Sequence, residues 1–222
     1  METGIARIEQ LMREVTGDGK HDGAARSTLD VLWVLYDRVL HYDAQEPHSE
    51  QRDRFVLSKG HGPLALYAIL ATKGFFSIDE LQTFTRWESR LGAHPDRTLV
   101  PGVETSTGSL GHGLPMAIGM ALGLRIKESD RRVFVLVGDG ECNEGSIWES
   151  ALLAGSQHLN RLTCIVINNH SSTPALGDIA AKFASFGWTA TTIDGRDAGQ
   201  IYTALTNIDS TRPTAVVAEI TR

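Results

Sequence analysis

Apolar and polar positions follow two patterns along the chain, one typical of helices and one typical of buried strands. Residues 5–15 place apolar side chains at positions 5, 8, 11, 12 and 15, which is the spacing of one helical face. Short runs such as VFVLV (133–137) and TCIVI (163–167) are apolar throughout and predict strands buried on both faces. The patterns predict helices over 5–15, 27–40, 62–74, 77–87, 111–127, 145–159, 175–187 and 197–208, and strands over 55–58, 133–137, 163–167, 189–193 and 214–220.

The alternation of strands and helices indicates the fold class. Apolar strands separated by helices are typical of an α/β fold, in which a parallel sheet is covered by helices on both faces. The 222 residues suit one large domain, so we expect residues 1–222 to form a single unit. The glycine-rich stretch 102–113 is predicted as a long loop that leads into a helix, and loops of that length are often functional.

Charge and composition exclude several classes of partner. A net charge of −6 argues against nucleic acid or an anionic membrane, because either requires a basic face. No stretch approaches the roughly 18 apolar residues of a membrane span, and the first residues lack an apolar signal region, so we expect a cytoplasmic protein. The two cysteines, Cys142 and Cys164, do not form a CxxC pair and indicate no disulfide framework.

Two neighbouring predicted strands end in residues that suit a metal ion. Gly138-Asp139-Gly140 follows strand 133–137, and Asn169 follows strand 163–167. Ligands of parallel sheets bind beyond the carboxyl ends of the strands, and oxygen ligands without His or Cys suit Mg²⁺. The glycines allow close approach of the backbone, and the start of helix 145–159 favours an anion. A metal-bridged diphosphate fits this edge, whereas GDG alone also fits a glycine turn with a solvated aspartate.

Five blocks of the chain carry a resemblance to a known family. They are RDRFVLSKGHG (52–62), LGAHPD (91–96), PGVETSTGSLGHG (101–113), GDGECNEGSIWE (138–149) and IDGRD (193–197). Together with GDG and the asparagine about thirty residues later, they resemble the N-terminal, thiamine-diphosphate-binding half of transketolase, in the family's order. The similarity covers nearly the whole chain. It implies the thiamine-diphosphate-binding fold and thiamine diphosphate with Mg²⁺ as cofactors, with Ca²⁺ or Mn²⁺ as possible substitutes.

The resemblance also implies roles for individual residues. The metal ligands would be Asp139, Asn169 and the main-chain carbonyl of Ser171. The residues at the cofactor would be His61, Gly108, Ser109, Leu110, Gly138, Asp139, Gly140, Glu141 and Asn169. His61 and His94 would contact substrate, His21 would do so from the KHDG turn, and Glu144 would lie at a subunit interface and communicate with a catalytic glutamate. Lys20 and Asp22 replace the family's glycine and proline beside His21, which leaves a surface histidine as the alternative there.

The implied enzyme transfers a two-carbon ketol or acyl unit from a ketose or 2-oxo donor to an aldehyde or ketone acceptor. The glutamate that activates the cofactor belongs, in this family, to a pyrimidine-binding domain, which the blocks do not include. We therefore expect that domain on a partner chain, a chain that is inactive alone, and an α₂β₂ assembly. Helix 145–159 supports a partner independently, because it is apolar around nearly its whole circumference.

Two departures from the family leave the substrate open. Residues 169–185 are shorter than the usual transketolase segment, and the chain stops before another cofactor-proximal histidine of the family. An ordinary sugar-phosphate substrate and an unusual sugar or carbocycle both remain compatible. Two other functions are also compatible: a subunit of a 2-oxo-acid decarboxylating enzyme with the same cofactor, and a non-catalytic regulatory paralogue.

Overall fold

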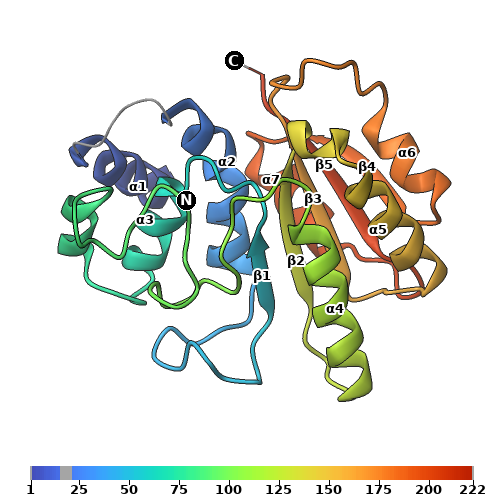
Figure 1. Cartoon of the computed structure of the whole chain (residues 1–222), viewed down its shortest axis with the longest axis horizontal. Coiled ribbons are helices and arrows are strands. Elements are labelled where there is room, and N and C mark those ends of the chain that lie inside the picture. Colours follow the sequence, from blue (N-terminus) through green and yellow to red (C-terminus); the bar gives the residue numbers. More distant parts are fainter. Residues whose placement is uncertain (1, 16–21, 222) are drawn as a thin grey trace.

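A parallel sheet forms the centre of the computed structural model, which describes residues 2–15 and 22–221 (Figure 1). The described strands are β1 (Arg54–Leu57), β2 (Val133–Gly138), β3 (Leu162–Asn168), β4 (Thr189–Asp194) and β5 (Thr214–Glu219). They lie in the order β1-β2-β3-β5-β4, and every neighbouring pair is parallel. The parallel sheet expected from the apolar runs is confirmed.

Helices connect the strands and cover both faces of the sheet. The α-helices are α1 (Glu2–Glu14), α2 (Asp22–Val34), α3 (Leu64–Thr72), α4 (Gly113–Ile126), α5 (Gly145–Ser156), α6 (Ile179–Ser185) and α7 (Ala198–Thr206). Three shorter elements complete the described part: a π-helical turn η2 (Leu35–Val39) and the 3₁₀-helices η3 (Ile78–Thr83) and η4 (Asp139–Asn143). No helix in these ranges is long and apolar enough to cross a membrane.

Alternate strand residues divide the core into two layers. Phe134 and Leu136 of β2 pack with residues of α1, α2, α3 and α7. Val133, Val135 and Val137 of the same strand pack with residues of α4, α5 and α6. Successive strand side chains point to opposite faces, so a strand that is apolar throughout contributes to both layers. Figure 1 shows α4, α5 and α6 together on one side of the sheet.

The strand register brings several loops to one edge of the sheet. Leu57 lies beside Leu136, Gly138 lies beside Ile167, and Asn168 lies beside Glu219. Parallel strands that end level with one another place their following loops side by side. The segments after β1, β2, β3 and β5 therefore meet at the carboxyl edge, which is the upper edge in Figure 1.

Several predicted elements differ from the structure. The helix expected over 175–187 begins only at Ile179, and the helix expected over 27–40 is α-helical over Asp22–Val34 and continues as the π-helical turn η2. The helix expected over 77–87 is the 3₁₀-helix η3, which begins at the Ser77 capping box and is followed by Thr85 and Glu88 with positive φ, a conformation that an α-helix excludes. The helix expected over 145–159 ends at Ser156. Strand β4 is an edge strand with mostly exposed side chains rather than a buried one.

Candidate cofactor site

Asp139 lies at the centre of the carboxyl edge, directly after β2. Its carboxylate is buried and accepts hydrogen bonds from the amide of Gly140 at 2.9 Å and the amide of Ser172 at 3.1 Å. The amide and hydroxyl of Ser171 also donate to it, at 2.6 and 2.7 Å. Donors from the segment after β3 thus hold that segment against the GDG turn. The expected proximity of Asp139 and Ser171 is present, although the contacts between them use the amide and hydroxyl of Ser171 and not its carbonyl oxygen.

Asn169 contributes an oxygen that the described protein does not use. Its Oδ1 atom is buried, and no group in residues 2–15 and 22–221 hydrogen-bonds to it. A buried polar atom without a partner is costly, and such atoms commonly mark the position of an ion or water. The buried carboxylate of Asp139 in the neighbouring turn and this buried amide oxygen are ligands that fit Mg²⁺.

Glu219, at the end of β5, holds the same segment from the other side. Its Oε1 atom accepts from Asn168 Nδ2 at 2.8 Å, and its Oε2 atom lies 3.0 Å from His170 Nε2. His170 itself has a φ of 55°, a left-handed conformation unusual outside glycine. The segment that carries Asn169 and Ser171 is therefore held between Glu219 and Asp139. Sequence reasoning missed Glu219, because its role depends on β5 lying beside β3.

Glu141 points into the domain rather than toward the edge. Its side chain is 2% exposed, and its oxygens accept hydrogen bonds from Ser58 Oγ at 2.5 Å, Gly111 N at 3.0 Å and Gly138 N at 2.9 Å. The expected cofactor contact of Glu141 stays a prediction, and the contacts that its side chain makes are with the protein. Ser58 was not among the residues expected at the site.

Lys59 is a second residue that the sequence reasoning missed. Its side chain is half-buried, its stem lies close to Gly138, and its Nζ donates to the carbonyl of Ala24 at 3.2 Å. Burial lowers the pKa of Lys59, and the charges of Asp139 and Glu141 oppose that shift. Its position just after β1, in the SKGHG block, could have indicated that it belongs to the site. Lys59 places a positive charge beside the carboxylates of Asp139 and Glu141.

The thiol of Cys142 lies under the GDG turn but is not a nucleophile. Its Sγ is 3.8 Å from the carbonyl oxygen of Gly138. Burial, followed by the charges of Glu141 and Asp139, raises the pKa of Cys142 to about 12. The thiol is therefore protonated at neutral pH, and a protonated thiol is a weak nucleophile.

His61 and His94 lie together, as expected for residues that share a substrate. Their rings are 5.0 Å apart between centroids and meet at 70°. His61 is exposed, whereas the Nδ1 atom of His94 is buried. His94 and Thr107 pack over Gly60 so closely that a Cβ there would lie 2.7 Å from each of them. Gly60 is thus required for the approach of the 91–107 segment to the SKGHG turn.

Gly108, Ser109 and Leu110 form an exposed part of the loop before α4. Gly108 has a φ of 144°, Ser109 Oγ lies 3.0 Å from His112 Nδ1, and Leu110 is half exposed. Glu144 is exposed just before α5. These positions leave both groups accessible to a ligand or partner, and their expected roles stay predictions. His21 lies outside the described residues.

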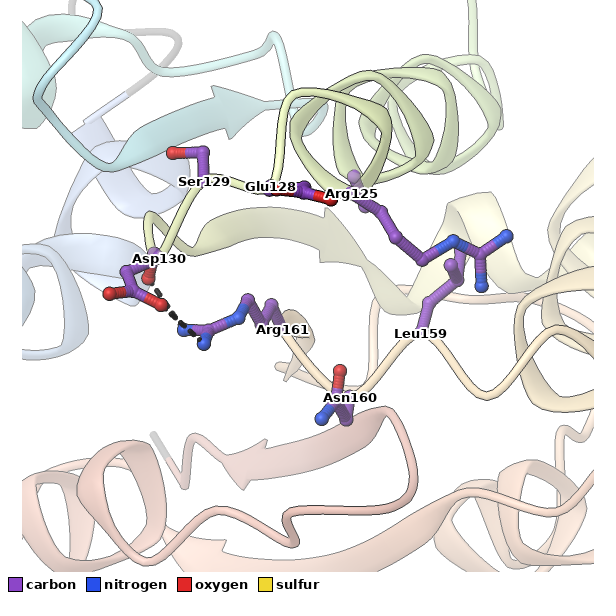
Figure 2. Close-up of a pocket in the computed structure, with 8 residues that line it drawn as sticks. Arg125, Glu128, Ser129, Asp130, Leu159, Asn160 and Arg161 are labelled. Atoms are coloured by element: carbon purple, nitrogen blue, oxygen red, sulfur yellow. Dashed lines mark hydrogen bonds and ion pairs between the residues drawn. The ribbon is translucent and has the colours of Figure 1, made fainter.

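One cavity lies far from this site. It has a volume of about 220 Å³ and lies between the segments that precede β2 and β3, at the amino ends of these strands. Figure 2 shows the residues that line it. Arg161 donates there to the main-chain and carboxylate oxygens of Asp130, at 2.6 and 2.8 Å. Arg125, the second arginine of this cavity, donates to the carbonyl and side-chain oxygens of Gln157. Both arginines are thus paired within the protein, and the cavity is on the opposite edge of the sheet from Asp139.

Comparison with known proteins agrees with the fold. The family described as "Transketolase, thiamine diphosphate binding domain" matches residues 14–221. The chain belongs to this family. The resemblance, the fold class and the transketolase-like enzyme class expected from the sequence are therefore confirmed, as is a thiamine-diphosphate-binding domain.

Several relatives share most of their length with the chain. A protein named ferredoxin fas2 from Rhodococcoides fascians is 48% identical over 97% of this chain and 71% of its own length. The 6-deoxy-6-sulfo-D-fructose transketolase of a Clostridium strain has a subunit that is 38% identical over 83% of the chain and 70% of its own length. The apulose-4-phosphate transketolase of Actinobacillus succinogenes has a subunit that is 37% identical over 92% of the chain and 77% of its own length.

Solved structures of transketolases have the same fold. A Pichia stipitis transketolase variant superposes with a TM-score of 0.86 at 26% identity and covers 98% of this chain. The Campylobacter jejuni transketolase gives a TM-score of 0.83 at 25% identity and covers 97% of it. The chain spans only 36% and 37% of those two proteins.

Proposed function

We propose that this chain supplies the metal- and diphosphate-binding half of a transketolase-type enzyme. The enzyme would transfer a two-carbon ketol or acyl unit from a ketose or 2-oxo donor to an aldehyde or ketone acceptor. The observation that carries the proposal is the buried Oδ1 atom of Asn169, which has no hydrogen-bond partner in the described residues. Asn169 follows β3, and Asp139 follows the neighbouring strand β2. Membership of the thiamine-diphosphate-binding family supports the same site.

Different residues at the carboxyl edge would bind the metal and the diphosphate of the cofactor. Thiamine diphosphate, when bound, supplies a stabilised carbanion for the transferred unit. Asp139, Asn169 and the carbonyl of Ser171 would hold Mg²⁺. The amide and hydroxyl of Ser171 contact Asp139, so its carbonyl oxygen is not used in that contact. Gly138 and Gly140 permit the diphosphate to approach the main chain, and the start of α5 favours its charge.

His61 and His94 would act on the substrate. An imidazole can donate a proton from one ring nitrogen and accept one at the other, so adjacent histidines suit the movement of protons at substrate hydroxyls. Their rings lie 5.0 Å apart on segments that pack on each other at Gly60. His21 is proposed for the same region on the resemblance alone.

We also propose that residues 1–222 form one domain and that a partner chain carries the pyrimidine-binding domain with its activating glutamate. Two relatives are named as transketolase subunits, which supports a divided enzyme. On α5, Leu152 and Leu153 are 56% and 46% exposed, and Leu110 and Met116 near the start of α4 are also exposed. This apolar surface, with Glu144 beside it, suits burial in an α₂β₂ assembly. A cytoplasmic location stays a prediction.

Small sugars are the proposed substrates. The names of two relatives refer to a sulfo-sugar and to apulose 4-phosphate, both outside the common pentose phosphates. An unusual ketose donor is therefore the first class to test with this chain. The departures in residues 169–185 are compatible with this class and with an ordinary sugar phosphate, so both are tested as donors.

The name of the 48% identical relative does not transfer to this chain. An iron–sulfur cluster of the ferredoxin kind is held by four cysteine thiolates, and this chain has two cysteines. Both cysteines are buried, one in η4 and one in β3. Residues 1–222 of this chain therefore do not supply the four thiolates of such a cluster. A 2-oxo-acid decarboxylating enzyme and a regulatory paralogue remain the alternative functions.

The decisive experiment measures transfer by the chain with its co-expressed partner. Product formation from ketose donors and aldehyde acceptors that requires the chain, the partner, thiamine diphosphate and Mg²⁺ is the expected result. Carbon dioxide release from 2-oxo acids without ketol transfer would favour the decarboxylase. Cofactor binding without turnover of either donor class would favour the regulatory paralogue.

A further inference from the structure

Three separate segments of the candidate site meet at the side chain of Glu141. Ser58 belongs to the SKGHG turn after β1, Gly111 to the glycine-rich loop before α4, and Gly138 to the end of β2. Each donates one hydrogen bond to the Glu141 carboxylate, at 2.5, 3.0 and 2.9 Å respectively. The Oγ of Ser58 also accepts from the amide of Gly113, the first residue of α4, at 3.1 Å.

These segments carry the residues expected to bind cofactor and substrate. His61 lies three positions after Ser58, Leu110 lies one position before Gly111, and Asp139 follows Gly138. Main-chain amides in loops have no helix or strand partner and must be satisfied by some other acceptor. Glu141 accepts from one loop amide, that of Gly111, and from the amide of Gly138 at the end of β2, which fixes the distance between the two segments.

The contacts require a carboxylate and not an amide. Oε1 accepts from Ser58 and Gly111, and Oε2 accepts from Gly138. A glutamine has one acceptor oxygen and one NH₂ group, so in either orientation its NH₂ would face a main-chain N–H. Hydrogen bonds to a charged acceptor are also stronger than neutral ones.

Glycine at two of the positions fits this arrangement. A Cβ on Gly111, which has a φ of 75°, would lie 2.4 Å from Ser146 Oγ and 2.7 Å from Glu144 Cβ. A Cβ on Gly113 would lie 2.2 Å from Ser58 Cβ. The carbonyl of Gly111 accepts from Ser146 Oγ at 2.9 Å, so α5 is attached to the same point.

We propose that Glu141 is a positioning residue of the cofactor site: it holds the SKGHG turn, the glycine-rich loop and the GDG turn in one fixed relation before the cofactor binds. The proposal rests on the proposed function, because it assigns those segments to thiamine diphosphate. Glu141 does not need to touch the cofactor in this role. Its effect on binding comes from the order that it imposes on the segments that do.

The test compares Glu141→Gln with a matched control, Asp53→Asn. Asp53 is 5% exposed and accepts from the amides of His41 and Arg132, at 3.0 and 2.8 Å, and from the Arg132 guanidinium at 3.3 Å. It is an equally buried carboxylate with three donors, but it precedes β1 at the opposite edge of the sheet. Both substitutions are expected to lower the unfolding temperature, so stability alone does not distinguish them.

Two measurements on the full chain distinguish a positioning role. Calorimetry with thiamine diphosphate and Mg²⁺ gives the affinity, and amide hydrogen exchange gives the protection of Gly111, Gly113 and Gly138. For Glu141→Gln we expect an affinity loss of about 10- to 100-fold, which is typical of residues that orient the binding groups of a site without touching the bound ligand. We also expect faster hydrogen exchange at these amides. For Asp53→Asn we expect neither change.

Ser58→Ala provides a second variant if Glu141→Gln does not fold. It removes the link to Gly113 and leaves Glu141 with both main-chain donors, so we expect a smaller affinity loss and faster exchange at Gly113. Wild-type affinity in Glu141→Gln, or in Ser58→Ala where only that variant folds, would overturn the proposal, as would an equal loss in Asp53→Asn. If the wild-type chain and its complex do not bind thiamine diphosphate, the proposed function fails. Amide hydrogen exchange in Glu141→Gln then tests separately whether Glu141 orders the three segments.

Discussion

The carboxylate of Asp139 accepts hydrogen bonds from both the amide and the hydroxyl of Ser171, at 2.6 and 2.7 Å, although the two residues follow different strands. This relationship joins the end of β2 to the segment after β3. Asn169 lies in the same segment, between Asn168, which contacts Glu219, and Ser171. Two of the proposed metal ligands, Asn169 and Ser171, are therefore on one short stretch, and that stretch is hydrogen-bonded to the third, Asp139.

Asn169→Ala separates metal binding from stability. The substitution removes an oxygen that makes no hydrogen bond in the described structure, and leaving a buried polar group unsatisfied costs about 1–3 kcal/mol. We expect an unchanged or higher unfolding temperature and a loss of Mg²⁺-dependent thiamine diphosphate affinity above about 100-fold, beyond the effect of residues that only orient ligands. Calorimetry and thermal unfolding measure the two effects.

Asn169→Asp is the matched control for that variant. It keeps an oxygen at the same position and is expected to retain much more of the Mg²⁺-dependent affinity than Asn169→Ala. Wild-type cofactor affinity in Asn169→Ala would contradict the assignment of this residue to the metal.

The placement of Asp139 and Asn169 at one edge of the sheet could be predicted from the sequence, because it depends only on local strand patterns and on strand pairing. Each residue follows an apolar run, and neighbouring parallel strands present their carboxyl ends at one edge. The roles of Glu219 and Lys59 depend on more distant relations. Glu219 reaches Asn168 across 51 positions, and that contact requires β5 to lie between β3 and β4. Such strand orders are not contained in the local pattern.

Local patterns also left the direction of Glu141 undetermined. The residue stands in the GDGE motif beside the predicted ligand, but it lies in the 3₁₀-helix η4 and its side chain turns inward to Ser58, 83 positions earlier. The helix predicted over 77–87 was wrong for a different reason. Its apolar spacing is helical, yet the left-handed conformations of Thr85 and Glu88 end the helix early.

Gly155→Ala is expected to destabilise the chain strongly. Gly155 lies in α5, and a Cβ there would be 1.8 Å from the carbonyl oxygen of Phe186, a main-chain atom that cannot turn aside. Overpacking of this kind costs about 1–3 kcal/mol or more. Gly123→Ala in α4 is the control, because nothing lies within 4 Å of its Cβ, and alanine there should add about 0.5–1 kcal/mol. Urea unfolding that gives both variants the same stability would contradict this packing.

Asp209 provides a pH-dependent contribution to stability. Its carboxylate accepts from Thr211 Oγ1 at 2.6 Å, from Thr211 N at 2.7 Å and from Thr189 Oγ1 at 2.8 Å, and these bonds lower its pKa from 3.8 to about 2. Because the folded pKa is the lower one, the contribution is present above the unfolded pKa and is lost as the pH falls toward 2. Asp209→Ala should therefore differ most from wild type at neutral pH and progressively less below about pH 4. Unfolding curves at several pH values measure this, and a difference that grows with acidity would contradict it.

The last prediction concerns the surface of α5 that we propose binds the partner. Trp148 lies on this helix, but its Nε1 donates to the carbonyl of Cys142 at 2.8 Å, and its ring packs 5.4 Å from that of Phe183. Trp148→Arg should therefore lower the stability of the chain itself, by about 3 kcal/mol. Leu152, which is 56% exposed, is the better probe of assembly.

Leu152→Arg should leave the unfolding temperature of the isolated chain unchanged, because its side chain already contacts water. In the complex it would bury an unpaired charge, which interfaces tolerate poorly, so we expect light scattering to show dissociation from the co-expressed partner. Tyr202→Arg is the control: Tyr202 is 41% exposed on α7, which packs in the other core layer, across the sheet from α5. An assembly that tolerates Leu152→Arg as well as Tyr202→Arg would show that the partner binds elsewhere.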